Sequence, residues 1–330
     1  IARLTAGLPL PADVVVGVGD DAAVIDLGDD RVLVATCDAL VEDVHFRLRT
    51  VNPESLGRRA LAVNLSDCAA MGAIPRFALI SLLAPRDTDT ALLDAIYAGL
   101  RAEAEAYGVA IVGGNVARNP ERLILDITLL GMGRRHRLLL RSGARAGDAI
   151  GVTGTVGTAA AGLLVVEDGQ LAAQISVEGR ATVLQAIHTP SPRVAAGQWL
   201  ADHGATAAID ISDGLAADLG HLCTASGVGA QIDAATLPIA PVTREVAGAT
   251  GRKARDLALF GGEDYELLFT VPAEQATALA RQLNTAVGVP VTLIGTVTAE
   301  STMILSNQGA MMPLPAKGWN HMARFTLERG

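Results

Sequence analysis

Short apolar segments alternate with segments of helix length over the first 135 residues, and this alternation limits the folds open to the chain. The first helix is expected to have Asn52 as its N-cap and Pro53 at its first position, and to stop at Gly72. A second helix is expected over residues 88–107. Strands are expected at residues 31–36, 77–83, 109–112 and 123–130. Such alternation is typical of an α/β domain.

A basic, glycine-containing segment at residues 134–147 separates this region from a second one that contains the same kinds of element. Strands are expected in the second region at residues 148–154, 207–211, 230–232, 265–271 and 291–297, and helices from about residue 156, at 215–226 and at 273–285. We therefore predict two domains, residues 1–138 and 139–330. A length of 330 residues fits two domains better than one.

The composition favours a large aliphatic core and argues against nucleic acid as a partner. Apolar residues make up 50% of the chain but aromatic residues only 3%, so the core must consist mainly of Ala, Val, Leu and Ile. A formal net charge of −9 repels a phosphate backbone. A small anionic substrate remains compatible with this charge if metal ions, local Arg or Lys, or helix N-termini hold it.

Cysteine usage and hydropathy point to a cytoplasmic protein. Cys37, Cys68 and Cys223 are far apart and no Cys-x-x-Cys occurs, so neither a zinc site nor a disulfide framework is indicated. Buried free thiols in a reducing compartment are expected instead. No apolar run reaches 18 residues, so no membrane span is expected. The first residues do not resemble a secretory signal.

Aspartates occur in tight groups beside glycine or other small residues. Asp20 and Asp21 follow Gly-Val-Gly, and Asp210 and Asp213 stand in Asp-Ile-Ser-Asp-Gly. Two unit charges about 4 Å apart repel by about 4 kcal/mol at an effective dielectric of 20. A cation is the simplest way to neutralise them, and hard oxygen ligands favour Mg²⁺, Mn²⁺ or Ca²⁺ over zinc. The pattern predicts metal-dependent phosphate chemistry.

Each group also has a structural interpretation. The glycine loop at residues 17–22 is neither a P-loop nor a dinucleotide fingerprint, and a polar turn would explain it. Asp210 or Asp213 is suitable as a helix cap, although a cap needs only one of them. The segment at residues 261–266 precedes an apolar strand and is compatible with a hairpin turn.

Polar residues also stand inside the first expected helix, where they are disfavoured. Asn64 and Asp67 are three residues apart, so they share a helix face, and their neighbours are apolar. A buried aspartate needs a partner. A metal ion would be one, and Arg58 or Arg59 would be the alternative.

Four further positions are candidates with two interpretations each. Asp38 follows an expected strand and is well placed to hold a metal, and His45 is either a phosphate donor or a structural histidine. Asn115 follows a glycine pair at the end of a strand and offers a neutral oxygen to a cation. Trp319 either stacks on a ligand ring or packs the C-terminal segment onto the core.

Taken together and in this order, the segments resemble the thiamine-monophosphate kinase family of the PurM-like (aminoimidazole-ribonucleotide-synthetase-like) ATP-binding superfamily. The resemblance extends from residue 1 to about residue 325. The segments that carry it are residues 17–22, 38–46, 62–67, 141–145, 210–215, 261–268 and 318–321.

This resemblance implies ATP-dependent transfer of the γ-phosphoryl group to thiamine monophosphate, with thiamine diphosphate and ADP as products. It implies a two-domain fold, with an N-terminal α/β domain that forms a β-barrel across a homodimer and a C-terminal α+β domain. Several Mg²⁺ ions per site are implied, with Mn²⁺ as a possible substitute. Direct metal-assisted transfer needs no acid–base side chain, because the acceptor phosphate is already ionised.

By position, the resemblance also implies the site residues. The implied metal ligands are Asp21, Thr36, Cys37, Asp38, Asp67, Asn115, Asp210 and Asp213. The implied ATP contacts are Tyr107, Gly114, Asn115, Arg141 and Ser212, and the implied substrate contacts are His45, Glu263 and Trp319. The family commonly has Gly-Gly-Asp-Thr where this chain has Asn115 and Val116, so a weaker metal site is expected there.

Two other functions compete with this one. The first is another PurM-like ATP-dependent synthetase or kinase, such as one that activates selenide, but the absence of a cysteine before Cys37 argues against selenide activation. The second is a module that binds nucleotide or divalent cations without catalysis. Turnover of thiamine monophosphate distinguishes the kinase from both.

Overall fold

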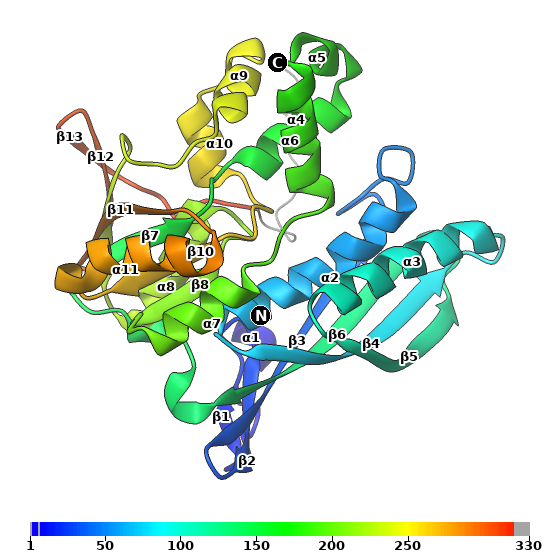
Figure 1. Cartoon of the computed structure of the whole chain (residues 1–330), viewed down its shortest axis with the longest axis horizontal. Coiled ribbons are helices and arrows are strands. Elements are labelled where there is room, and N and C mark those ends of the chain that lie inside the picture. The colour runs from blue at the N-terminus through cyan, green and yellow to red at the C-terminus, as the bar shows by residue number, and fades with distance from the viewer. Residues whose placement is uncertain (1, 6, 320–330) are drawn as a thin grey trace.

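Two β-sheets, one from each half of the chain, form the framework of the computed structural model, which describes residues 2–5 and 7–319 (Figure 1). The first sheet has the strand order β1-β2-β3-β6-β4-β5, and only β4 and β5 run parallel. Its strands are β1 Val14–Val16, β2 Ala23–Gly28, β3 Arg31–Val41, β4 Ile74–Ala84, β5 Ala110–Arg118 and β6 Ile124–Arg134. The short helix α1 (Ala2–Thr5) precedes them.

Helices α2 (Pro53–Ala70) and α3 (Thr90–Ala106) cover one face of the first sheet (Figure 1). The predicted start of α2 is confirmed, because the Asn52 side chain accepts hydrogen bonds from the backbone of Glu54 (2.9 Å) and Ser55 (3.4 Å). The helix ends just before Gly72, whose φ of +66° an L side chain rarely adopts. Helix α2 also contacts the second half, so it is buried on nearly all sides.

The second sheet has the strand order β13-β12-β9-β11-β7-β10-β8, in which only β9 and β12 run parallel. Its strands are β7 Ala149–Thr153, β8 Ala207–Asp210, β9 Gly229–Asp233, β10 Leu267–Val271, β11 Val291–Thr298, β12 Met303–Asn307 and β13 Ala310–Pro313. Two 3-10 turns, Arg135–Arg137 and Arg141–Gly143, connect the two sheets.

The helices of the second half pack on both faces of its sheet. Helix α8 covers one face, and α11 and α7 lie against the other, where their apolar side chains join the core of the first half. Five further helices, α4, α5, α6, α9 and α10, share a separate small core at the top of Figure 1. The bounds are α4 Thr158–Glu167, α5 Gly169–Gln174, α6 Val177–His188, α7 Val194–Asp202, α8 Leu215–Ser226, α9 Pro241–Ala249, α10 Ala254–Phe260 and α11 Ala273–Val287. None of the described helices is both long and apolar enough to cross a membrane.

The two-domain α/β fold agrees with the prediction, but three details of the expected strands are wrong. Asp38 lies within β3 and Asn115 within β5, not at strand ends, and β10 begins at Leu267, two residues after Tyr265. An apolar run stops at the first polar side chain, whereas strand pairing uses backbone groups and continues past it. Among the unpredicted helices, α6 and α7 show weak helical periodicity, whereas α9 is clearly amphipathic and was missed despite that signal.

Glycine permits the close contact between α2 and α3. A Cβ at Gly57 would lie 1.9 Å from the carbonyl oxygen of Ile96, and one at Gly99 would lie 1.9 Å from that of Glu54. We expect Gly57→Ala to lower the free energy of unfolding by about 1–3 kcal/mol or more, since the helices must separate. Urea unfolding followed by circular dichroism measures the change.

The matched control for this substitution is Gly248→Ala in α9, where a new Cβ would meet nothing within 4 Å. Alanine should stabilise that helix by about 0.5–1 kcal/mol. Equal effects of the two substitutions would contradict the close packing of α2 on α3.

Candidate metal and phosphate site

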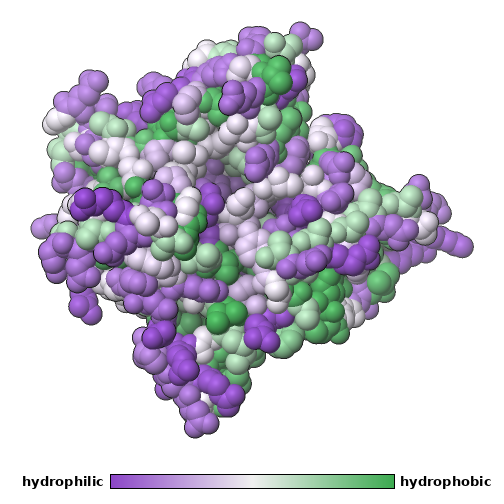
Figure 2. All heavy atoms as spheres, in the orientation of Figure 1, coloured by the Kyte–Doolittle hydropathy of each residue, from purple (hydrophilic) through white to green (hydrophobic). Residues whose placement is uncertain are grey.

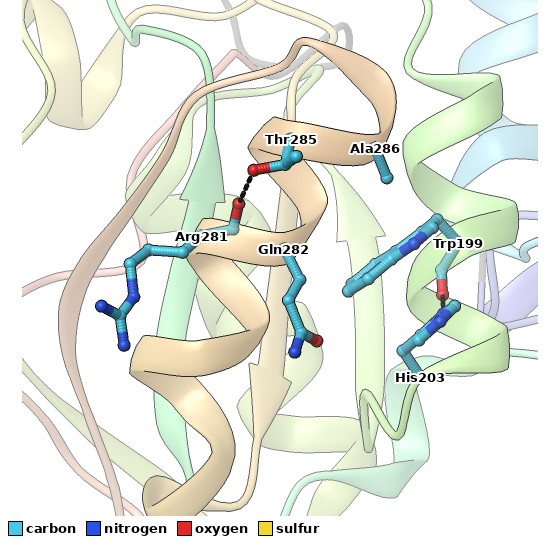
Figure 3. A pocket seen from close by; sticks show the side chains of 6 residues that line it. All are labelled: Trp199, His203, Arg281, Gln282, Thr285 and Ala286. Atoms are coloured by element: carbon cyan, nitrogen blue, oxygen red, sulfur yellow. Dashed lines mark hydrogen bonds between the residues drawn. The ribbon is translucent and has the colours of Figure 1, made fainter.

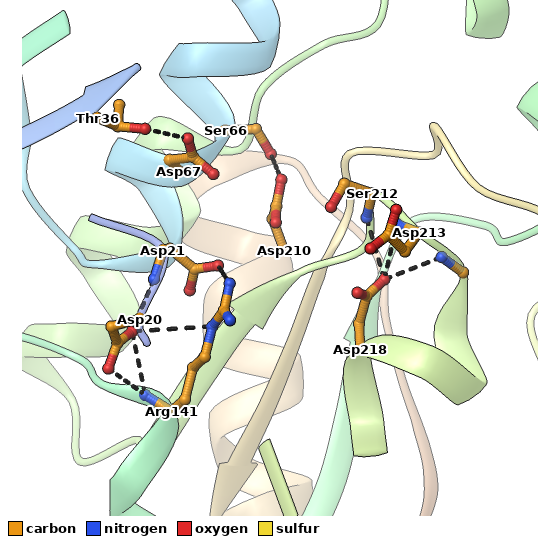
Figure 4. Close-up of polar contacts among 11 residues, drawn as sticks. Asp20, Asp21, Thr36, Ser66, Asp67, Arg141, Asp210, Ser212, Asp213 and Asp218 are labelled. Carbon is orange, nitrogen blue, oxygen red and sulfur yellow. Dashed lines mark hydrogen bonds and ion pairs between the residues drawn. The ribbon is translucent and has the colours of Figure 1, made fainter. Parts of the chain in front are cut away.

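Three aspartates from distant parts of the sequence converge between the two halves (Figure 4). Asp21 precedes β2, Asp67 lies inside α2, and Asp210 ends β8. One carboxylate oxygen of each lies within 4.8 Å of the others. We call these three residues the acid cluster.

Helix α2 holds the acid cluster together through its polar interior residues. Ser66 donates a hydrogen bond of 2.7 Å to Oδ2 of Asp210, and Thr36 on β3 donates to Oδ2 of Asp67 (Figure 4). The Asn64 side chain accepts a hydrogen bond of 3.1 Å from the backbone N–H of Asp38. The polar positions of this helix are thus occupied by contacts to strands of both sheets.

The arginines considered as partners of Asp67 pair elsewhere, so that alternative is wrong. Arg58 lies 3.3 Å from a carboxylate oxygen of Glu103, and Arg59 pairs with Glu263. The charge of Asp67 is therefore not balanced by either arginine.

Arg141 brings positive charge to the edge of the cluster. Its guanidinium donates to Oδ1 of Asp21, and its backbone N–H donates to Oδ2 of Asp20 at 3.2 Å (Figure 4). Asp20 also accepts from the backbone of Asp21 at 3.0 Å, so its carboxylate fixes the turn between β1 and β2. The expected polar turn is therefore present, but it also delivers Asp21 to the cluster.

Burial and mutual repulsion disfavour the ionised carboxylates of the cluster. Burial raises the pKa of Asp21 to about 8 even though Arg141 opposes the shift. Burial raises the pKa of Asp210 to about 6 against the hydrogen bond from Ser66, and the charge of Asp38 adds to the rise. The pKa of Asp67 is raised well above its ordinary value by burial and by the neighbouring carboxylates.

These observations fit a divalent cation. Oδ2 of Asp21 is buried and finds no hydrogen-bond partner within the described residues. The donors are all oxygens, which hard cations such as Mg²⁺ prefer. A bound cation would satisfy the orphaned oxygen and compensate the excess negative charge.

A second acidic group adjoins the first. Ligand atoms of Asp213, Asp218 and His221 lie within 4.8 Å of one another, and the charge of Asp213 raises the pKa of Asp210. Oδ2 of Asp218 accepts hydrogen bonds from the backbone of Ser212 (3.1 Å), Asp213 (3.2 Å) and Gly214 (3.0 Å) (Figure 4). Asp218 thereby fixes the loop that carries Asp213.

The sequence analysis missed Asp218, and the capping alternative considered for Asp210 and Asp213 is wrong. Gly214 is the N-cap of α8, so neither Asp210 nor Asp213 caps it. An acidic residue in the first turn of a helix commonly faces the free backbone N–H groups there, and that signal was available in the sequence.

The side chains of β3 point to opposite faces of the sheet. Thr36 and Asp38 face α2, and the charge of Asp38 raises the pKa of both Asp67 and Asp210. Cys37 points the other way: its thiol donates to Asp126 at 3.2 Å. Cys37 is also exposed, whereas a buried thiol was expected.

The structure does not bring Asn115 to the acid cluster of its own chain. Asn115 pairs with Ser81, which pairs with Asp126, so all three share the sheet face that carries the Cys37 thiol. Three inter-strand steps of about 4.8 Å separate β5 from β3. Gly114 lies on the same strand, where a Cβ would sit 1.8 Å from the carbonyl oxygen of Ile80. The Tyr107 hydroxyl, at the end of α3, donates to the Pro192 carbonyl at 3.3 Å.

The expected substrate residues lie on two sides of the cluster. Arg59 contacts both His45 and Glu263. Residues 261–266 connect helix α10 to strand β10, so they do not form a hairpin between two strands and that interpretation is wrong. The backbone N–H of Trp319 donates to the carbonyl of Asp213 at 2.9 Å, and the residue is 41% exposed. The last two residues of the tail motif, 320 and 321, lie outside the described residues.

A surface pocket of about 380 Å³ lies elsewhere, between α7 and α11 (Figure 3). Trp199 stacks on His203 there with ring centroids 3.8 Å apart. The residues that line the pocket are Trp199, His203, Arg281, Gln282, Thr285 and Ala286. None of these described residues is a carboxylate, so the pocket does not suit a hard cation.

Comparisons with known proteins agree on one family. The sequence models of the AIR synthase related protein family match residues 19–133 (N-terminal domain) and 145–306 (C-terminal domain). Thiamine-monophosphate kinase of Escherichia coli strain K12 is 41% identical over 94% of this chain and 93% of its own length. The Bacillus subtilis strain 168 enzyme of the same name is 36% identical over 93% of each.

A solved structure described as AaThiL complexed with AMPPCP and TMP has the same fold. It superimposes with a TM-score of 0.80 and 34% sequence identity, and the match covers 92% of this chain and 91% of that one.

The acid cluster predicts how stability depends on pH and on Mg²⁺. The raised pKa values of Asp21 and Asp210 stabilise the folded state below the ordinary aspartate pKa, and this contribution is lost as the pH rises through about 6 to 8. We expect Mg²⁺ to restore stability at about pH 8.5 much more than at about pH 5, because the cation binds ionised carboxylates. Urea unfolding midpoints with EDTA and with Mg²⁺ at both pH values measure this.

Asp67→Asn is the control for the cation effect. It removes one repelling charge, so the metal-free variant should be more stable than the wild type at the higher pH and should respond less to Mg²⁺. A urea midpoint of the wild type that is the same with Mg²⁺ as with EDTA would rule out the cation site.

Proposed function

Because this chain belongs to the thiamine-monophosphate kinase family, we propose that it transfers the γ-phosphoryl group of ATP to the phosphate of thiamine monophosphate. The observation that carries the proposal is the convergence of Asp21, Asp67 and Asp210 from both halves of the chain. Nucleophile and electrophile are both anionic phosphates in this reaction. The site must therefore neutralise charge and align two phosphates more than it must move protons.

The acid cluster would hold Mg²⁺, which would supply positive charge to offset the negative charge of the phosphates. Asp38 and Asp213 border the cluster and extend the set of oxygen ligands. Thr36 and Ser66 orient the carboxylates of Asp67 and Asp210 through their hydroxyl groups. The Cys37 thiol bonds to Asp126 on the other face of β3, so only the backbone of Cys37 remains as a candidate ligand. These oxygen ligands suit Mn²⁺ as well as Mg²⁺.

We assign ATP to the side of Arg141 and Ser212. The side chain of Arg141 is 20% exposed at the edge of the cluster, where its guanidinium can contact a phosphate as well as Asp21. The backbone N–H of Ser212 is taken by Asp218, so its hydroxyl is the group that remains for a nucleotide. We assign Tyr107 to this substrate as well.

We assign thiamine monophosphate to the side of His45, Glu263 and Trp319. The exposed Trp319 ring offers a surface for stacking a heteroaromatic ring, and its backbone bond to Asp213 keeps it beside the second acidic group. The positive charge of a thiazolium ring suits the Glu263 carboxylate, which is 28% exposed.

The phosphoryl group passes directly from donor to acceptor. The acceptor phosphate is ionised at neutral pH, so no side chain has to remove a proton from it. No phosphorylated residue is needed, because both substrates are bound together.

We also propose that a second copy of the chain covers the open face of the first sheet. That face exposes Ile74 (52%), Phe77 (38%) and Leu79 (39%), and Figure 2 shows hydrophobic side chains gathered where β4, β5 and β6 lie. Two such sheets would close into a barrel and bury this apolar surface. The same contact would place Gly114 and Asn115 at the subunit boundary, where a site shared by both subunits could use them.

The first test of the function is turnover. Protein incubated with ATP, Mg²⁺ and thiamine monophosphate should form thiamine diphosphate and ADP, and EDTA should abolish the reaction. Asp67→Asn should lower kcat at least about a hundredfold, since it removes charge from the cluster. Asp87→Asn, at an exposed aspartate before α3, should leave kcat unchanged.

Three results would contradict this assignment. Tight ATP binding without turnover would favour a non-catalytic module. Near-normal kcat in Asp67→Asn would remove that residue from the metal site. Label retained on denatured protein after incubation with γ-labelled ATP would contradict direct transfer.

The dimer is tested by a charge on the open face. Leu79→Arg should convert the dimer to a monomer in light scattering, because a buried arginine without a partner is costly. Val177→Arg, at a residue that is 76% exposed at the start of α6, is the matched control and should remain dimeric. A monomeric wild-type protein at micromolar concentration would contradict the proposed dimer.

A further inference from the structure

Arg59 is buried in the interior of α2 and carries its charge to the substrate side of the site. Its side chain is 2% exposed. One terminal nitrogen donates to the carbonyl of His45 at 3.0 Å, and the other donates to Oε1 of Glu263. A single guanidinium therefore contacts both of the residues proposed to bind thiamine monophosphate on this side.

The ion pair between Arg59 and Glu263 is not explained by stability. A buried ion pair loses the hydration of both charges, and apolar residues of similar volume are often at least as stabilising. The pair joins residues 204 positions apart, one on α2 and one in the loop before β10. It thus fixes the position of the second half relative to the first beside the acid cluster.

Glu263 is held in a backbone conformation that its residue type rarely adopts. Its φ is +68°, and Tyr265 follows with a φ of +50°. Such conformations persist only where the surroundings impose them, and they gather at functional sites. Backbone bonds from Glu263 to Ser212 (2.8 Å) and from Tyr265 to Ile211 (2.9 Å) anchor this loop to the segment after β8.

The carboxylate of Glu263 is held at one oxygen but is not enclosed. Arg59 takes Oε1, while 28% of the side chain remains exposed. Glu263, Asp38 and Asp210 all influence the pKa of Tyr265, so the pair lies beside the acids on which phosphoryl transfer is proposed to depend.

We propose that Arg59 is a positioning residue for the acceptor substrate. It fixes the Glu263 carboxylate and the turn that carries His45, so that both present one preformed surface to thiamine monophosphate. This inference rests on the proposed function. Arg59 acts through these two residues, so its loss should raise the KM for thiamine monophosphate and leave the KM for ATP unchanged.

Steady-state kinetics with each substrate varied in turn tests the proposal. Arg59→Lys keeps the charge but cannot reach both acceptors, because lysine lacks the planar fork. We expect its KM for thiamine monophosphate to rise at least about tenfold while its KM for ATP stays within about twofold. Arg59→Met should raise the KM for thiamine monophosphate more than Arg59→Lys does. If the Arg59→Met protein does not fold, Arg59→Lys alone decides the test.

Arg58→Met is the matched control. Arg58 is the preceding residue of α2, but its ion pair with Glu103 (3.3 Å) faces α3. Both KM values should stay within about twofold of the wild type. A rise in the KM for thiamine monophosphate like that in Arg59→Lys would mean that any lost ion pair on α2 disturbs the site, and would overturn the proposal.

A double-mutant cycle tests whether Arg59 acts through Glu263. In a Glu263→Gln background, Arg59→Lys should raise the KM for thiamine monophosphate by a smaller factor than it does in the wild type, because only the contact to His45 is then left to lose. Multiplying effects, or an unchanged KM in Arg59→Lys beside an active wild type, would overturn this inference alone. A wild-type protein that does not turn over thiamine monophosphate would overturn the proposed function and this inference with it.

Discussion

The mutual repulsion of three buried aspartate carboxylates is the constraint to which the rest of the structure responds. Asp21, Asp67 and Asp210 offer oxygens within 4.8 Å of one another, and burial raises the pKa of each. Packing and hydrogen bonds from neighbouring residues must hold them there against this repulsion. A divalent cation converts the same arrangement from an unfavourable one into a binding site, which is why the family's chemistry suits this fold.

Helix α2 is the element that meets this constraint. It lies between the two halves, and close packing on both sides leaves it little freedom to move: a Cβ at Gly197 of α7 would lie 1.9 Å from the carbonyl oxygen of Ala69. Its polar interior residues bond outward, Ser66 to β8 and Asn64 to β3. Arg59 adds a contact to the loop before β10. The site and the interface between the halves are therefore built from one helix.

Much of this arrangement could be predicted from the sequence because its causes are local. The cap at Asn52 and the stop before Gly72 define α2, and the disfavoured Asn64 and Asp67 in its interior already indicated a functional face. The alternation of strands and helices gave the α/β class. Some of the missed helices, such as α6 and α7, have weak periodicity, so their formation depends on tertiary packing.

By itself, the sequence determined the kind of chemistry. Its grouped oxygen ligands indicate a hard cation, and the order of its motifs along the chain indicates the family. Only the tertiary structure decided which side chains meet. The Cys37 thiol and Asn115 lie on the sheet face opposite the acid cluster, because side chains alternate between the two faces along a strand. The tertiary structure also placed Arg59 between the turn that carries His45 and the loop that carries Glu263, because no local pattern encodes the paths of these two segments.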